Sequence, residues 1–262
     1  MATTLPQPVR LSLEQALAQW RRWRPSPATA PEALQLLAGG RSNTSVLVGN
    51  ADARWVVRID GTAPDRLGLS RSAEWQSLEH AAGHAIAPRP VYRNSELGVL
   101  VVQYQETDES AVHGIAELAE LLRAIHALPS IHFRLDPLAR ARRYLALAGG
   151  GELPAELLSA CHRLAAEPVA LHLCHNDLLV ANRLASGGRL LAIDWEYVAM
   201  GDPLFDLAVI IEGDGLADAE ALELHSRWLG RQPGQTELDR LSDQRVVYRA
   251  LASLWEAIPR SP

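Results

Sequence analysis

Apolar and polar residues follow two different spacings along this chain. The pattern from Ser12 to Trp23 has the three- to four-residue spacing of a helix, and Gln15, three residues after Ser12, predicts a capped start. The chain then has short apolar runs bounded by glycine, asparagine and aspartate, which predict antiparallel strands. These strands are expected at residues 33–38, 44–48, 54–59, 91–92 and 98–104, with a helix at residues 66–84. The first hundred residues therefore predict a sheet with one packed helix.

The pattern changes after a polar stretch at residues 105–110. Five later segments have helical periodicity, namely residues 115–128, 137–147, 154–166, 217–229 and 237–258. Residues 171–194 are the exception, because two short apolar runs there flank a polar loop and a glycine turn. We therefore expect an α+β protein of two domains, a sheet-rich domain at residues 1–104 and a mainly helical domain at residues 105–262.

Composition narrows the possible functions. The 262 residues are 48% hydrophobic with a formal net charge of -6, enough chain for a buried core and without the basic face that nucleic acids require. All 25 basic residues are arginine, which excludes a lysine-dependent phosphate loop and a Schiff-base mechanism. Two cysteines, no targeting pattern and no long apolar stretch predict a cytoplasmic protein without a membrane span.

Six polar residues within a short stretch of the second half carry the candidate chemistry. They are His175, Asp177, Asn182, Asp194, Asp202 and Asp206. Asp194 follows an apolar run, so its carboxylate is expected at a strand end, where an unpaired buried charge is costly. A cation would relieve that cost, and the oxygen donors of Asp194 and Asn182 suit Mg²⁺ better than zinc. Magnesium with few protein ligands indicates a phosphate-bearing substrate.

Asp177 is the candidate base of this group. It lies in the loop between two apolar runs, where it can accept a proton from a substrate hydroxyl as that oxygen attacks phosphorus. His175 joins the catalytic group, with bracing of the loop as its expected role. Each aspartate alone is equally well explained as a turn or cap residue, whereas all of them in this order favour a site.

The motifs of this region resemble a known family. His-x-Asp-x-x-x-x-Asn, followed by Ile-Asp-Trp-Glu-Tyr and Gly-Asp-Pro-x-x-Asp-Leu-Ala, resembles the choline/ethanolamine kinases and bacterial thiamine kinases of the aminoglycoside phosphotransferase group. The resemblance implies a two-lobed protein-kinase-like fold with an antiparallel-sheet N-lobe and a mainly helical C-lobe. It also implies that Asp177 is the catalytic base, that Asn182 and Asp194 bind magnesium, and that Asp206 anchors the catalytic loop.

The same resemblance assigns ATP-binding roles, more weakly, in the first hundred residues. The turn similar to the family's phosphate turn contains Gly40, Ser42, Asn43 and Thr44. Arg58 stands where protein kinases have the strand lysine that holds ATP phosphates, and Glu74 matches the helix glutamate that pairs with it. An ordinary surface ion pair is the alternative explanation of these two residues. Tyr104 belongs to residues 101–106, which are expected to meet adenine.

The acceptor is expected to be a small alcohol. The form of the motifs ranks choline, ethanolamine or thiamine first, and a cationic acceptor would meet the charge of Glu196 and the ring of Trp255. The aromatic pattern is half present, because Ala252 stands where choline kinases have a further tryptophan. An aminoglycoside or sugar is the alternative, for which residues 216–223 supply acidic side chains. The non-enzyme alternative is a nucleotide-binding module, although Asp177 and both metal ligands are present.

Overall fold

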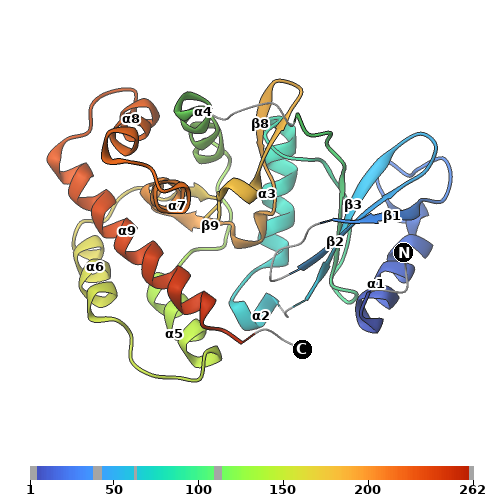
Figure 1. Cartoon of the computed structure of the whole chain (residues 1–262), viewed down its shortest axis with the longest axis horizontal. Helices are drawn as coiled ribbons and strands as arrows, with labels where there is room; N and C mark the ends of the chain where they lie inside the picture. Colours follow the sequence, from blue (N-terminus) through green and yellow to red (C-terminus); the bar gives the residue numbers. More distant parts are fainter. Residues whose placement is uncertain (1–4, 38–42, 62–63, 109–113, 260–262) are drawn as a thin grey trace. The chain divides into compact units, whose positions relative to one another are not determined.

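The chain forms two compact units (Figure 1). The computed structural model describes residues 5–37, 43–61, 64–108 and 114–259. Described residues up to 66 and from 88 to 106 form the first unit, and residues 67–87 and 107–259 form the second. The division differs from the one expected at residue 104, because α3 (Arg71–Gly83) groups with the second unit. An ion pair ties the start of α3 there, with Arg71 Nη2 lying 3.2 Å from Glu196 Oε2.

A five-stranded antiparallel sheet is the centre of the first unit. Its strands are β1 (Glu32–Leu36), β2 (Asn43–Gly49), β3 (Arg54–Asp60), β4 (Pro90–Asn94) and β5 (Val99–Gln103), in the order β1-β2-β3-β5-β4. Asn50 holds the turn between β2 and β3, since its Oδ1 accepts hydrogen bonds from the backbone N–H groups of Asp52 (3.0 Å) and Ala53 (2.9 Å). The predicted antiparallel meander is confirmed.

One face of this sheet and the first helix enclose a core. The buried members of the sheet strands include Val46, Val48, Val57, Ile59 and Val101. Trp23 is fully buried against them and packs edge-on to Trp55, with ring centroids 5.6 Å apart. Leu13 and Ala16 of α1 (Gln7–Ala18) complete the cluster. Burial of these side chains removes a large apolar area from water, which stabilises the unit independently of the second core.

The first helix begins earlier than predicted. α1 follows Pro6, and Pro8 lies in its first turn, where the N–H that proline lacks has no helical partner. Ser12 lies inside the helix and caps nothing, so its predicted role was wrong. The helix also ends at Ala18, and a short 3-10 turn at Trp20–Arg22 continues the chain towards Trp23.

The second unit is mainly helical. Its helices are α3 (Arg71–Gly83), α4 (Ile115–His126), α5 (Pro137–Leu147), α6 (Ala155–Ala166), α7 (Leu204–Asp214), α8 (Asp218–Leu229) and α9 (Gln235–Glu256). The long α9 packs against α5, α6 and α7, and α4 packs against α8 (Figure 1). The core between these helices includes Tyr144, Leu157, Phe205, Val209 and Val247. No helix in the described ranges is long and apolar enough to cross a membrane.

Two expectations about helices are corrected by the structure. The helix expected at residues 66–84 is split, because α2 (Pro64–Leu67) ends before Gly68, whose φ is +71°. α3 then starts after Ser70, whose Oγ accepts a hydrogen bond from the Ala73 N–H at 3.2 Å. α7 was not predicted, because residues 204–211 are all buried and therefore show no amphipathic period.

Two small sheets of the second unit present its polar loops. β6 (His172–Cys174) pairs with β9 (Ala199–Gly201), and β7 (Arg183–Ser186) pairs with β8 (Arg189–Ala192). Gly187 and Gly188 connect β7 to β8 with φ values of 57° and 73°, as a two-residue hairpin turn requires. Residues 175–182 follow β6, and Asp194 comes just after β8. Asp194 therefore lies just beyond a strand end, as the sequence pattern predicts.

Candidate active site

The loop that follows β6 carries the predicted base. Asn176 adopts a left-handed backbone conformation with φ of 64°, which asparagine tolerates better than most residues. Its Nδ2 donates hydrogen bonds to the carbonyl oxygens of Cys174 (3.2 Å) and Tyr197 (3.0 Å). The second bond ties this loop to the segment after Asp194. Asp177 is thereby held one residue beyond a buried, doubly anchored turn.

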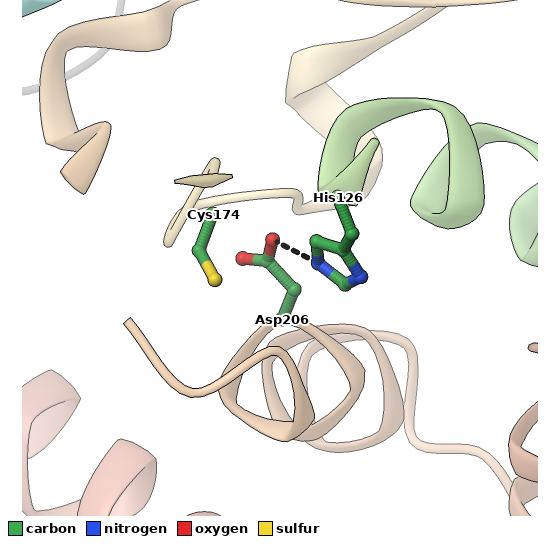
Figure 2. A group of neighbouring side chains, drawn as sticks. All are labelled: His126, Cys174 and Asp206. Atoms are coloured by element: carbon green, nitrogen blue, oxygen red, sulfur yellow. Dashed lines mark hydrogen bonds and ion pairs between the residues drawn. The ribbon is translucent and has the colours of Figure 1, made fainter. Parts of the chain in front are cut away.

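Asp206, in the first turn of α7, accepts hydrogen bonds from the backbone of the same loop. Its carboxylate is fully buried and accepts hydrogen bonds from the backbone N–H groups of His175 (2.9 Å) and Asn176 (2.6 Å). A further contact comes from His126, whose Nε2 lies 3.0 Å from Asp206 Oδ2 (Figure 2). Several donors compensate the burial of a charged carboxylate. These contacts give Asp206 the geometry of a loop anchor.

His175 is a brace of the loop. Its side chain is fully buried, and its Nε2 donates a hydrogen bond to the carbonyl oxygen of Ile193 at 3.0 Å. The ring also packs edge-on against Trp195, with ring centroids 4.9 Å apart. Burial lowers the pKa of His175 to about 4, so the ring is neutral at physiological pH. The geometry therefore favours the bracing role over proton transfer.

Asp177 and Asn182 contact each other across the loop. Asn182 Nδ2 lies 2.7 Å from Asp177 Oδ2 and 2.8 Å from the Asp177 carbonyl oxygen. Burial, followed by the negative charges of Asp194 and Glu196, raises the pKa of Asp177 well above its usual range. A carboxylate with a raised pKa is a stronger base, and the same charges mark a place where a cation would be stabilised.

A backbone hydrogen bond joins the segment of Asp194 to Asn182, the other predicted magnesium ligand. It adopts a left-handed conformation with φ of 60° and ψ of 63°. The N–H of the preceding Ile193 donates to the carbonyl oxygen of Asn182 at 2.9 Å. Within the described ranges, Asn182 Oδ1 accepts no hydrogen bond, since only Nδ2 contacts Asp177. An amide oxygen and a carboxylate in a negative environment are a donor set that fits Mg²⁺.

One arginine joins Glu74 to Glu196. Arg71 Nη1 lies 2.8 Å from Glu74 Oε2, and Arg71 Nη2 lies 3.2 Å from Glu196 Oε2. Both carboxylates are buried, so α3 is tied to the 3-10 turn at Trp195–Tyr197 by a shared charge. The sequence reasoning missed Arg71, although its position three residues before Glu74 on a helix could have indicated the first pair. Contact of Glu196 with a substrate stays a prediction.

Three of the expected nucleotide-binding residues, Asn43, Thr44 and Arg58, lie toward the open end of the β2–β3 hairpin. Asn43 and Thr44 begin β2, and the register pairs Thr44 with Ile59 and Ser45 with Arg58. Arg58 is buried, and its Nη2 lies 3.9 Å from Asp60 Oδ1. A buried guanidinium at the end of a hairpin is a suitable group for phosphate oxygens.

Other nucleotide predictions stay untested by this geometry. Gly40 and Ser42 lie outside the described residues. Tyr104 follows β5, and its N–H donates to the carbonyl oxygen of Arg54 at 3.1 Å. Arg58 and Glu74 belong to different units, so their pairing stays a prediction.

The charge of Asp177 contributes to the raised pKa values of two tyrosines in the second unit. Burial and the charge of Asp177 raise the pKa of Tyr248 to about 12. Burial raises the pKa of Tyr144 as well, and Asp177 adds to that effect. Trp255 packs against the second core, and its expected contact with substrate stays a prediction. Tyr144 was missed because its position fits the apolar face of a helix equally well.

Asp202 is removed from the candidate metal-binding group, because its carboxylate has other partners. Its Oδ1 accepts a hydrogen bond from the Leu204 N–H at 3.0 Å, and its Oδ2 lies 2.6 Å from Arg240 Nε and 2.7 Å from Gln244 Nε2. The Gly-Asp-Pro aspartate therefore starts α7 and ties it to α9. Its expected role as part of a carboxylate group for a cation is corrected, because an arginine already balances its charge.

A five-stranded antiparallel sheet, a mainly helical second unit and the two loops around Asp177 and Asp194 are the features of the two-lobed fold expected from the sequence. The model of the family described as "Phosphotransferase enzyme family" matches residues 33–243, and the chain belongs to this family. The predicted superfamily and the predicted fold are thereby confirmed.

Relatives of the chain agree with this assignment. The chain is 28% identical over 195 residues to Protein LicA of Haemophilus influenzae, a match that covers 66% of this chain and 56% of LicA. The match thus spans little more than half of that relative. The crystal structure of choline kinase LicA from Streptococcus pneumoniae has a TM-score of 0.74 at 22% identity, covering 94% of this chain and 89% of that one. A thermostable mutant of aminoglycoside phosphotransferase APH(4)-Ia has a TM-score of 0.62 at 19% identity, covering 87% and 88%. At these identities the two structures establish the fold.

Proposed function

We propose that this protein transfers the γ-phosphate of ATP to the hydroxyl group of a small, positively charged alcohol. Choline or ethanolamine and thiamine are the first candidates. The observation that carries the proposal is Asp177, hydrogen-bonded to Asn182 and influenced by the charge of Asp194, on a loop that Asp206 holds. A base, two oxygen donors for a metal and a fixed loop are the parts that phosphoryl transfer to an alcohol needs.

Asp177 acts as the base in this proposal. The acceptor oxygen attacks the γ-phosphorus, the bond from that phosphorus to the bridging oxygen breaks, and ADP leaves with the electron pair. The hydroxyl proton passes to the Asp177 carboxylate. The hydrogen bond from Asn182 engages Oδ2, and Oδ1 accepts none from the described part of the chain, so we assign Oδ1 to the acceptor.

Asn182 and Asp194 are the residues that would hold Mg²⁺. The fit rests on their oxygen donors and on the negative charge that raises the pKa of Asp177. When bound, Mg²⁺ neutralises phosphate charge and offsets the repulsion between the carboxylates. The chain itself fixes the two donors, because the Ile193 N–H bonds to the Asn182 carbonyl oxygen.

ATP phosphates are assigned to the first unit. Arg58 is buried at the end of the β2–β3 hairpin, next to Asn43 and Thr44 on the partner strand. The planar fork of arginine can bond two phosphate oxygens at once, so a chain without lysine can still bind ATP. Support for a nucleotide also comes from a solved structure described as LicA in complex with AMP.

Charge pairing near the end of α7 favours a singly charged acceptor over a polycation. Glu212 Oε1 is paired with Arg245 and lies 2.8 Å from Arg249 Nη1. Asp214 Oδ1 lies 2.5 Å from Arg183 Nη2. These carboxylates are already balanced by arginine, so they offer little attraction for the several ammonium groups of an aminoglycoside.

Two acidic residues of α8 also have partners within the protein. Glu220 Oε2 accepts a hydrogen bond from the Ala217 N–H at 2.9 Å, and Glu223 lies 2.7 Å from Arg227 Nε. Capping and an exposed ion pair therefore account for Glu220 and Glu223, two of the acidic residues that the sequence offered in support of an aminoglycoside.

The test is magnesium-dependent release of ADP from ATP, measured with choline, ethanolamine, thiamine, hexoses and kanamycin. Asp177→Asn is the blank, and Asp239→Asn on the exposed face of α9 is the matched control. We expect one of the small cationic alcohols to stimulate release strongly, and Asp177→Asn to lower kcat by about a thousandfold or more while ATP still binds. Preference for kanamycin or a hexose would overturn the acceptor assignment, and ATP binding without turnover would favour the non-enzyme alternative.

A further inference from the structure

A one-way chain of hydrogen bonds runs from Trp228 through His126 to Asp206, the residue that holds the catalytic loop. Trp228 Nε1, on α8, donates to His126 Nδ1 at 3.0 Å. His126, the last residue of α4, places Nε2 3.0 Å from Asp206 Oδ2. An indole N–H can only donate, so Nδ1 must accept and the imidazole hydrogen must lie on Nε2. Trp228 therefore determines which nitrogen of His126 donates to Asp206.

The same three-residue neighbourhood could be mistaken for a metal site. His126, Cys174 and Asp206 come close enough together to share an ion (Figure 2). The hydrogen bonds exclude that arrangement, because both nitrogens of His126 are engaged and both oxygens of Asp206 receive backbone N–H groups. Burial raises the pKa of Cys174 well above its usual range, which keeps the thiol protonated. The group is a hydrogen-bond network.

We infer that His126 and Trp228 are positioning residues for the catalytic loop. Asp206 Oδ2 is shared between His126 Nε2 and the His175 N–H, while Oδ1 receives the Asn176 N–H. Without the His126 donor, the buried Asp206 carboxylate loses one of its hydrogen-bond partners. The orientation of the carboxylate plane is then less well fixed. The two N–H groups it holds belong to the residues directly before Asp177. The catalytic consequence rests on the proposed function; the bond chain does not.

Neighbouring hydrogen bonds hold α4, α8 and β6 together around the contacts from Trp228 through His126 to Asp206. Arg123 Nη1 donates to the Arg227 carbonyl oxygen at 2.9 Å, which locks α4 to α8 beside Trp228. The His126 and Trp228 rings meet edge-on, with centroids 5.6 Å apart and planes at 87°. His172 Nδ1 donates to the His126 carbonyl oxygen at 2.9 Å, so β6 is held at the same point. The end of α4 therefore contacts both β6, the strand before the catalytic loop, and Asp206, which holds that loop.

Activity measurements separate positioning from packing. His126→Phe keeps a ring and removes the donor, whereas His126→Gln offers an amide N–H near the place of Nε2. We expect His126→Phe to lower kcat about tenfold or more with KM for ATP changed less than about twofold, and His126→Gln to recover most of the loss. Trp228→Phe, which keeps an aromatic ring but removes the indole N–H together with part of the ring, should lower kcat a few-fold. His132→Gln is the exposed control. Equal losses in Phe and Gln variants, or none in either, would overturn the inference.

A second measurement does not depend on turnover. NMR of the imidazole nitrogens should place the hydrogen of His126 on Nε2 in the wild type, and Trp228→Phe should shift the Nδ1 signal. Amide exchange at His175 and Asn176 should be faster in both His126→Phe and Trp228→Phe, because their acceptor is less well fixed. A hydrogen on Nδ1, or unchanged exchange, would contradict the inference. If no acceptor were phosphorylated while these NMR results held, the proposed function would fail and the inference would stand.

Discussion

At the residue scale, the carboxylates of the second unit differ in the groups that they contact. Asp202 contacts Arg240, and Glu212 contacts two arginines. Asp177 instead accepts its hydrogen bond from the neutral amide of Asn182, and its pKa is raised by nearby carboxylates. Asp177 is partly buried near other carboxylates, which is an unfavourable place for a negative charge, and groups with such raised pKa values are common at functional sites.

Asp194→Asn tests the assignment of a metal ligand. Asparagine tolerates the left-handed backbone of this position, so the fold should be preserved. We expect the Mg²⁺ concentration for half-maximal turnover to rise about tenfold or more, since the site loses a negative oxygen donor. Titration of Mg²⁺ at saturating ATP measures this, with Asp239→Asn as control. An unchanged Mg²⁺ requirement would remove Asp194 from the metal site.

Single residues could be predicted from the sequence where a motif fixes their spacing. Asp177, Asn182 and Asp206 do come together around one loop. Asp202 was grouped with them because spacing cannot reveal that Arg240, 38 residues later, balances its charge. Arg71 was missed for a related reason, since one of its two partners is distant in sequence and joins it only through the packing of α3.

At the element scale, Asp202 is the joint between α7 and α9. Asp202→Ala removes the bond to the Leu204 N–H and leaves Arg240 and Gln244 without this acceptor. We expect a loss of about 2 kcal/mol in the free energy of unfolding, from the lost hydrogen bond to the Leu204 N–H and the weakened, partly buried ion pair. Urea unfolding of the variant and wild type measures it. A change below about 0.5 kcal/mol would show that the joint contributes little.

The start of α9 gives a pH-dependent contribution to stability. The hydrogen bond from Arg231, and then the Gly234 N–H, lower the pKa of Glu237 from 4.5 to about 2. The unfolded state therefore binds this proton first, so the stabilisation is complete above about pH 4.5 and is lost as pH falls towards 2. The pair is partly exposed, so salt screens it and the effect is small.

Glu237→Gln isolates this contribution. We expect the variant to unfold at a lower urea concentration than the wild type at neutral pH, and the difference to shrink at about pH 3.5 in low salt. The comparison uses urea midpoints of the two proteins at both pH values. A difference that stayed constant or grew on acidification would contradict the pKa direction.

Elements could be predicted wherever burial is one-sided. The residue-137–147 helix and the β2–β3 hairpin show clear periods, and the structure has them close to the expected bounds. α7 was missed because it is buried on all sides, and α1 was misplaced because its start depends on two prolines. The left-handed Gly68 that splits α2 from α3 has no apolar signal at all.

At the scale of the whole molecule, the residues of the proposed function are distributed over two units that each have a core. The first unit supplies Arg58 and the start of β2, and the second supplies the loop of Asp177 and the anchor Asp206. A motif spacing could predict each set separately. The pairing of Arg58 with Glu74 depends on how the units meet, which neither spacing nor burial within a unit determines.

The most direct test of the account is the fate of the acceptor's own oxygen. The small cationic alcohol that stimulates ADP release is labelled with a heavy isotope at its hydroxyl oxygen and incubated with MgATP and the wild type, Asp239→Asn or Asp177→Asn, and the product is analysed by mass spectrometry. We predict a phosphorylated acceptor that retains the label in the first two reactions, and almost none with Asp177→Asn, because the acceptor oxygen attacks phosphorus as its proton passes to Asp177. Loss of the label, or labelled product formed equally fast by Asp177→Asn, would contradict it.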